Sequence, residues 1–206
     1  MKNLEPKLRT LTVSPDDLIW NDRGSGAYAD GSFWTYAENL GNYKLLGDTL
    51  CGQPNSHNSP CEKMMLVEDN GDGILAQPSG VTRIWTDAGS GADRDVAVFR
   101  LNPPKGYVCL GDIALGDYDN GDYPNLDRYR CVRHDFVDEA YVSTYSIWED
   151  RGSGAHRDFA GYDIEDTATT ISVGLFHGDG LHGDWTYYQN YKYANTVYGL
   201  ISSKLV

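Results

Sequence analysis

The chain has 206 residues, of which 30 are acidic and 17 basic, giving a formal net charge of −13 at pH 7. This excess of acid argues against a nucleic-acid partner, because binding to phosphates needs a basic face. No stretch approaches the ~20 consecutive apolar residues of a membrane-spanning helix, so we expect no transmembrane segment. The first six residues contain no apolar signal core, which is expected of a cytosolic protein or of a mature form without its leader.

In chain order, three segments share the pattern Trp-x-Asp-x-Gly-Ser-Gly-Ala-x-x-Asp. They begin at Trp20, Trp85 and Trp148, which are 65 and 63 residues apart. An aromatic residue follows each tryptophan after 14 positions, and a glycine between apolar residues follows after about 26. Units of about 60 residues bury too little surface to be stable alone. We therefore expect one domain, residues 1–206, built of three repeats at about 14–78, 79–141 and 142–206.

Each repeat reads as strands and turns, in keeping with 23 glycines and 15 tyrosines. Short β-branched or aromatic runs stand on both sides of each Gly-Ser-Gly turn and predict a hairpin. The runs at 18–20 and 32–36, 83–85 and 96–100, and 145–148 and 159–163 form these pairs. Residues 107–110 predict a third strand, and 66–67 and 130–132 predict fourth strands. The fold class expected is all-β: a three-fold pseudo-symmetric, β-prism-like domain of three roughly four-stranded sheets, with a two-sheet β-sandwich as the alternative.

Four cysteines divide into two pairs of different character. Cys51 and Cys61 flank a polar loop with two prolines, and we expect them to form a disulfide if the protein is secreted. Cys109 and Cys131 lie in apolar, strand-like runs, where a buried thiol and a bridge are equally consistent with the sequence. A secreted or extracellular location is slightly favoured over a cytoplasmic one.

The signature, with two further segments, resembles a known family. Residues 103–114 read Pro-Pro-Lys-Gly-Tyr-Val-Cys-Leu-Gly-Asp-Ile-Ala, and residues 130–133 read Arg-Cys-Val-Arg. Together they resemble the vacuolar protein sorting-associated protein 62 family, from about Ser14 to the end of the chain. Relatives that stand beside pore-forming or toxin-like domains imply a surface-recognition role. The first repeat departs from the family pattern at residues 36–42, where the Pro-Pro-x-Gly turn is missing.

The repeated acids are the candidate binding residues. Each signature holds two aspartates eight residues apart around the glycine turn: Asp22 and Asp30, Asp87 and Asp95, Asp150 and Asp158. Carboxylate and carbonyl oxygens suit Ca²⁺ or sugar hydroxyls, and Gly26, Gly91 and Gly154 leave room for a ligand and should include residues with positive φ. Asp87 and Asp95 are the candidate metal ligands, with Ca²⁺ the candidate ion. In the competing interpretation each aspartate accepts loop N–H groups and only fixes the shape of the turn.

Other motifs have simpler interpretations. The acidic runs at 68–73 and 117–122 lack the EF-hand order and predict solvated turns. The segment from His177 to Asp184 predicts an exposed loop, and the three signature tryptophans predict core positions. Tyr187, Tyr188, Tyr191, Tyr193 and Tyr198 form a tyrosine-rich tail, which predicts either a strand face or an aromatic contact surface.

These features favour a non-enzymatic, lectin-like recognition module that binds glycans or membrane surfaces, as a targeting part of a toxin or defence system. The alternative is an intracellular protein-interaction domain linked to vacuolar trafficking. An enzyme is the least favoured class, because Gly-Ser-Gly-Ala lacks the spacing of a nucleophile elbow and a triplicated active site is improbable.

Overall fold

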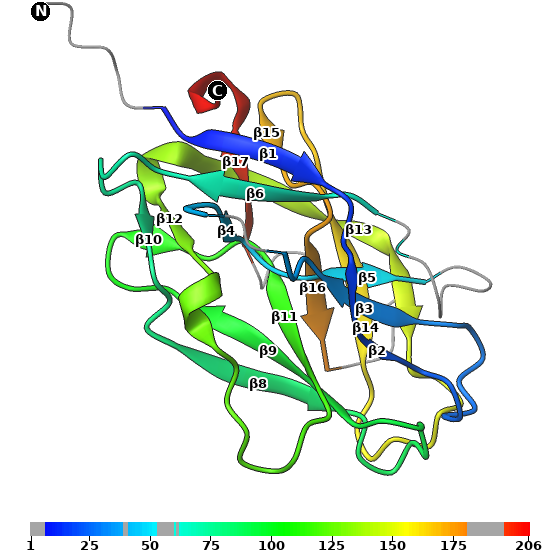
Figure 1. Ribbon diagram of the computed structural model, residues 1–206. Helices are drawn as coiled ribbons and strands as arrows, with labels where there is room; N and C mark the ends of the chain where they lie inside the picture. The colour runs from blue at the N-terminus through cyan, green and yellow to red at the C-terminus, as the bar shows by residue number, and fades with distance from the viewer. Residues whose placement is uncertain (1–6, 39–40, 53–59, 61, 181–195) are drawn as a thin grey trace, which may run out of the picture.

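The computed structural model describes residues 7–38, 41–52, 60, 62–180 and 196–206, and within them all regular structure is β-strand or short 3₁₀ helix (Figure 1). The all-β prediction is therefore confirmed. The strands fall into three sets that follow the chain. The first set is β1 (Arg9–Val13), β2 (Asp17–Asn21), β3 (Ser32–Thr35), β4 (Lys44–Leu45), β5 (Thr49–Cys51) and β6 (Met64–Glu68). The second is β7 (Leu75–Ala76), β8 (Gly80–Thr86), β9 (Val96–Asn102), β10 (Tyr107–Val108), β11 (Asp112–Gly116) and β12 (Cys131–Arg133). The third is β13 (Val137–Glu149), β14 (Ala160–Glu165), β15 (Thr170–Ile171), β16 (Phe176–Asp179) and β17 (Val197–Ile201). Three 3₁₀ turns complete the regular structure: η2 (Leu126–Arg128), η3 (His134–Phe136) and η4 (Ser202–Lys204).

The signature hairpins form as predicted. They are β2–β3, β8–β9 and β13–β14, and each gains a third antiparallel strand, β5, β11 or β16. In all three the register shifts just before the tryptophan, so that one extra residue stands on the first strand. Such a bulge bends a strand and re-aims its side chains. Here it accompanies the turn of each tryptophan into the interior.

The remaining strands build a second tier of sheets. Their orders are β1-β6-β4, β10-β12-β7 and β15-β17-β13. The strands predicted at 66–67 and 130–132 are present as β6 and β12, but they pair in this second tier and not with the hairpins. Each of the three strand sets, which span residues 9–68, 75–133 and 137–201 and so begin a few residues before the predicted repeats, thus supplies two three-stranded groups in place of one four-stranded sheet. Because the 13-residue β13 runs through both tiers, the third repeat joins its two sheets into one of five strands.

The glycines after Leu46 and Leu110 explain why the chain passes between tiers at this point. A Cβ placed on Gly47 would lie 2.9 Å from the Cα of Gly111, so the backbones of the first two repeats meet where only glycine fits. Asp48 and Asp112 then fasten each repeat to the next. The N–H of Ala114 donates to Asp48 Oδ2 over 2.9 Å, and the N–H of Gly178 donates to Asp112 Oδ2 over 2.8 Å. The third repeat has Leu175 at the corresponding position, so this link is made twice.

Three clusters of buried side chains form the core of the described residues. The larger two fill the two tiers, and the third, which includes Leu66, Phe99 and Tyr129, draws on strands of both tiers. The hairpin tier encloses the three tryptophans, each at most 2% exposed, together with Phe33, Phe159 and Phe176. Their rings form one continuous aromatic cluster, with centroids of the three tryptophans 5.7–6.4 Å apart. The predicted core role of the tryptophans is confirmed. The second tier packs around aliphatic residues such as Leu46, Leu110 and Val132.

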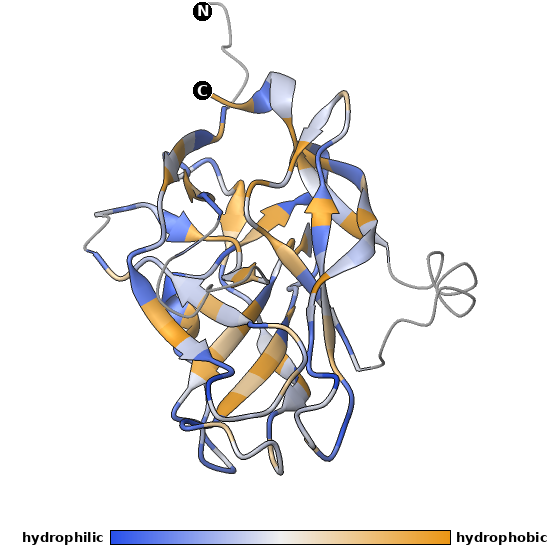
Figure 2. Ribbon diagram, turned by 90° about the vertical axis from the view of Figure 1, so that its right-hand side faces the viewer, coloured by the Kyte–Doolittle hydropathy of each residue, from blue (hydrophilic) through white to orange (hydrophobic). Residues whose placement is uncertain are grey.

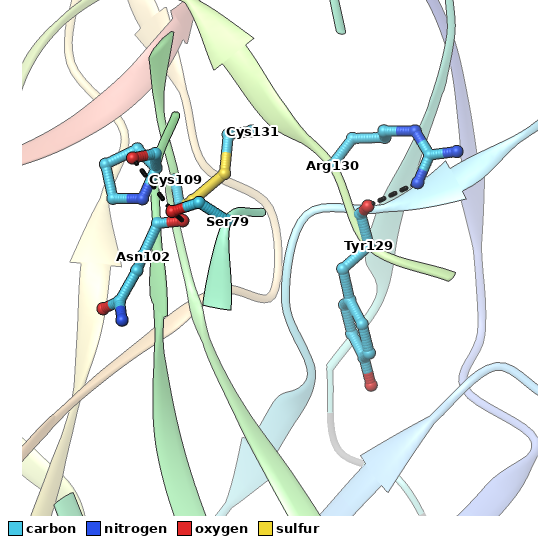
Figure 3. Close-up of a disulfide and its surroundings, with 7 residues drawn as sticks. Ser79, Asn102, Cys109, Tyr129, Arg130 and Cys131 are labelled. Atoms are coloured by element: carbon cyan, nitrogen blue, oxygen red, sulfur yellow. Dashed lines mark hydrogen bonds between the residues drawn. A yellow bond between two sulfur atoms is a disulfide. The ribbon is translucent and has the colours of Figure 1, made fainter. Parts of the chain in front are cut away.

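A disulfide joins Cys109 to Cys131, whose Cα atoms are 4.1 Å apart (Figure 3). This resolves the alternatives left open for that pair in favour of a bridge. Cys51 is also disulfide-bonded. Its predicted partner, Cys61, lies outside the described residues, as do Tyr187, Tyr188, Tyr191 and Tyr193 of the tyrosine-rich tail.

Candidate functional site

The three signature turns lie side by side at one end of the molecule, away from the C-terminus (Figure 1). We call residues 21–31, 86–95 and 149–158 the loop collar. Most of its residues are exposed, and its ribbon is coloured mainly as hydrophilic (Figure 2). The collar closes the aromatic end of the core, because the strands that lead into it carry the buried tryptophans.

Each loop of the collar is held by the same main-chain bonds. The signature serine donates its N–H to the carbonyl oxygen of the first aspartate over 2.8–2.9 Å in all three loops. Its Oγ then accepts the N–H of the alanine two residues later at 3.1 Å. Ser25, Ser90 and Ser153 are buried for this reason. These serines shape turns.

The first aspartate of each pair is buried, at 3–5% exposure. The N–H of Val96 donates to Asp87 Oδ1 over 2.9 Å, and the N–H of Phe159 donates to Asp150 Oδ1 over the same distance. In the first loop, Trp148 Nε1 donates to Asp22 Oδ2 over 3.3 Å. The first aspartates therefore carry the loop-shaping role of the competing interpretation.

The second aspartates lie nearer the surface: Asp95 and Asp158 are exposed and Asp30 is half-buried. Burial raises the pKa of Asp87, and the nearby Asp95 carboxylate raises it further against the lowering effect of the Val96 N–H. The pair predicted as a metal site is thus close enough for the two charges to interact. Within the described ranges, no three His, Cys, Asp or Glu side chains gather in an arrangement that would hold a metal ion.

The glycines of the turns have the predicted conformation. Gly26, Gly91 and Gly154 have φ values of 80°, 77° and 79°. These values lie in the left-handed region, where a β-branched side chain is strained. The prediction of positive φ at these three positions is confirmed.

We expect Gly91→Val to lower the free energy of unfolding by about 1 kcal/mol or more, through backbone strain alone. A Cβ at Gly91 would have only the Gly24 carbonyl oxygen nearby, at 3.8 Å, so steric overlap adds little. Thermal denaturation would measure the change, with Gly180→Val as the control, because Gly180 is exposed with open space around it and no positive φ. Equal melting temperatures for the two variants would contradict the prediction.

Hydrogen bonds link the three loops in a closed ring. The indole N–H of each tryptophan donates to a carbonyl oxygen of the next loop: Trp20 to Arg94 at 2.6 Å, Trp85 to Arg157 at 2.8 Å and Trp148 to Ala29 at 2.9 Å. Main-chain bonds of 2.9 Å run back in the other direction, from Tyr28 to Arg151, from Asp93 to Arg23 and from His156 to Ala88. Each loop is therefore positioned by both of its neighbours, which fixes the collar as one unit.

One equivalent position in each loop differs in side chain and faces solvent. It is occupied by Tyr28, Asp93 and His156, and all three are exposed. Each side chain lies over the first glycine of a neighbouring loop. A Cβ on Gly152 would lie 2.5 Å from Tyr28 Cε1, one on Gly24 would lie 2.8 Å from Asp93 Oδ1, and one on Gly89 would lie 2.6 Å from His156 Cδ2. Sequence reasoning missed these residues, although the signal was present: this position varies directly after the repeated alanine of the signature.

Ion pairs flank the collar. Arg94 makes a two-pronged pair with Asp117, with contacts of 2.7 and 2.6 Å, and this lowers the pKa of the Asp117 carboxyl. Arg151 contacts Glu149 Oε2 through Nη2 at 3.2 Å and Nε at 3.4 Å. Charged donors and acceptors thus stand beside the exposed positions of the loops.

Two other expectations have definite outcomes. His177, predicted in an exposed loop, is only 9% exposed within β16; its placement there was predicted wrongly. It lies beside Arg100, which forms an ion pair with Asp112, and burial lowers the pKa of the histidine. His182 is outside the described residues.

At the acidic run 68–73, Asp69 accepts the N–H groups of Gly71, Ile74 and Leu75, as expected of a turn.

Comparisons with known proteins agree with this architecture. The family model described as vacuolar protein sorting-associated protein 62 matches residues 7–187. Among solved structures, GNIP1Aa from Chromobacterium piscinae is similar, with a TM-score of 0.81 and 25% sequence identity. The match covers 98% of this chain but only 39% of the GNIP1Aa chain, so the present chain spans about two-fifths of that protein's length. No curated protein matches the sequence. No helix in the described part of the chain is long and apolar enough to cross a membrane.

Proposed function

We propose, on the premise that the chain belongs to the vacuolar protein sorting-associated protein 62 family, that it is a non-enzymatic, lectin-like recognition module whose binding face is the loop collar. The observation that carries the proposal is that each loop combines repeated structural residues with a variable exposed residue. The buried aspartates and serines and the turn glycines are the same three times, whereas the exposed residues Tyr28, Asp93 and His156 differ. A rigid frame that presents variable side chains is typical of binding surfaces.

The proposed ligand class is a glycan or a membrane surface outside the cell. Support for this setting comes from the Cys109–Cys131 disulfide, since disulfides persist in oxidising compartments and are rare in the cytosol. The same observation weighs against the alternative of an intracellular trafficking domain. The length match to GNIP1Aa supports the idea that a module of this fold can be one part of a longer protein, here as the targeting part of a toxin or defence system.

Binding to a glycan array and to liposomes of neutral and of anionic phospholipids, each with and without Ca²⁺, tests the proposal. We expect binding in at least one of these formats, weakened by the double substitution Tyr28→Ala with His156→Ala. Tyr123→Ala is the matched control, because Tyr123 is an exposed tyrosine outside the collar. Binding that the collar variant leaves intact would place recognition elsewhere, and no binding in any format would contradict the function.

A comparison of the protein with and without Ca²⁺ also tests the hypothesis that Asp87 and Asp95 bind a cation. If the pair holds an ion, Ca²⁺ should raise the melting temperature of the wild type, and Asp95→Asn should abolish the increase. We choose Asp95 because it is exposed, whereas Asp87 is buried and accepts the Val96 N–H, so that a change there could also disturb the loop. A melting temperature independent of millimolar Ca²⁺ would refute the hypothesis.

A further inference from the structure

Tyr28 is the one tyrosine, phenylalanine or tryptophan within the collar, and it is 83% exposed although its main chain is held in place. Its N–H is bonded to the Arg151 carbonyl oxygen at 2.9 Å, and its ring lies against Gly152, where any larger residue would collide with it. An aromatic ring on a fixed main chain presents its apolar surface to solvent with little loss of entropy on binding.

Polar groups suited to hydroxyls lie in the loop that contains Gly152. Arg151 directly precedes Gly152, and its guanidinium is paired with Glu149 at 3.2 Å. Both side chains keep contact with solvent, with exposed fractions of 49% for Arg151 and 27% for Glu149. Ser146 Oγ donates to the other oxygen of Glu149 over 3.2 Å, which fixes the carboxylate. A planar donor and a fixed acceptor therefore belong to the same loop as the glycine against which the ring lies.

We propose that the seam between the first and third loops is a single binding site for a neutral pyranose sugar. The apolar C–H face of the sugar packs on Tyr28, and its hydroxyls bond to Arg151 and Glu149. This inference rests on the proposed recognition function and specifies its ligand class. An aromatic surface with a few placed polar groups is the usual construction of a small-ligand site.

A sugar fits this surface better than a membrane does. In the described part of the collar, Tyr28 is the one exposed large hydrophobic residue, and the other exposed residues of the collar include the charged Arg23, Asp93, Arg94 and Asp158. Membrane insertion needs a larger apolar area, and the net charge of −13 opposes binding to anionic lipids.

The other two seams lack the combination. The second loop places Asp93 over Gly24, beside Arg23, and the third places His156 over Gly89, beside Ala88. The contact at Asp93 has an arginine but no aromatic ring, and the contact at His156 has neither a tyrosine nor an arginine. The structure therefore assigns one site per chain.

Titration calorimetry with the methyl glycosides of glucose, galactose, mannose and N-acetylglucosamine tests the inference. For at least one of them we expect a stoichiometry of one. Tyr28→Ala should weaken this binding by roughly 10-fold, as for loss of about 1.4 kcal/mol of ring contact, while Tyr28→Phe retains it.

The outcomes separate this inference from the proposed function. Sugar binding that Tyr28→Ala leaves unchanged, or a wild-type stoichiometry of three, would overturn the site at Tyr28 while recognition stands. Binding to liposomes without any binding to the glycosides would refute the sugar and keep the recognition function. Failure of glycosides, glycan array and liposomes alike would refute both.

Discussion

Replacement of Trp148 by alanine is expected to lower the free energy of unfolding by about 3–5 kcal/mol, which is the usual cost of truncating a large buried aromatic side chain. Trp148 is 2% exposed and contacts the rings of Trp20, Trp85 and Phe159, with centroids 5.7–6.1 Å away. Its loss would leave a cavity where all three repeats meet and would break the bond from its indole to Ala29. For a chain of this size, the melting temperature should fall by about 10 °C.

Trp148→Phe separates the two contributions. It keeps most of the apolar volume but removes the indole N–H, so the Ala29 carbonyl oxygen loses one donor, at a cost of about 1–2 kcal/mol. Tyr123→Ala, at an exposed tyrosine, is expected to change stability by no more than about 0.5 kcal/mol. Denaturant unfolding of the three variants measures the series. A Trp148→Ala variant as stable as Tyr123→Ala would mean that the ring of tryptophans does not hold the repeats together.

Stability should depend on pH through Asp48, which links the first repeat to the second. Burial raises the pKa of its carboxyl from 3.8 to about 6, against the lowering effects of the Ala114 N–H and the Tyr129 hydroxyl. Below about pH 4 the carboxyl is protonated in both the folded and the unfolded state. Between pH 4 and 6 the unfolded state loses its proton first, so the folded state becomes less stable as pH rises. The full loss above pH 6 is on the order of 3 kcal/mol, at 1.36 kcal/mol for each pKa unit.

Asp48→Asn should remove this dependence, because an amide cannot ionise and still offers an oxygen to the Ala114 N–H. The stability of the variant relative to the wild type should therefore rise between pH 4 and 7. Urea unfolding at several pH values gives this difference, and Asp72→Asn, at an exposed turn, is the control. A difference that is flat with pH would mean that Asp48 ionises as readily in the folded state as in the unfolded state.

Sequence reasoning succeeded where a structural role is repeated along the chain. The tryptophans, the turn glycines and the hairpin strands occur three times with fixed spacing, so the pattern predicted their burial, their conformation and their pairing. The positive φ of Gly26, Gly91 and Gly154 follows from the turn itself. These properties depend on residues close to one another in sequence.

Properties that depend on distant contacts were not predictable in this way. The separation of the signature hairpins from the strands of the second tier depends on the approach of Gly47 to Gly111. His177 is buried because it meets Arg100 from another repeat, which no local pattern reveals.

The candidate site also depends on contacts between residues that are distant in sequence. The repeated aspartates drew attention because they recur, but recurrence marks what the three loops need in order to fold. Tyr28 stands at a position where the repeats differ, and its contacts with Gly152 and Arg151 of another loop cannot be read from the sequence.

The meeting of the two ends of the described chain has a consequence for how the collar is presented. Leu8 and Leu205 form a parallel bridge, and the N–H of Val206 donates to the Leu8 carbonyl oxygen over 3.0 Å. The C-terminus lies at the end of the molecule opposite the collar (Figure 1). A neighbouring domain joined at either end of the described chain would therefore be attached at the same end of the molecule. The collar would then point away from that domain and be accessible to a ligand.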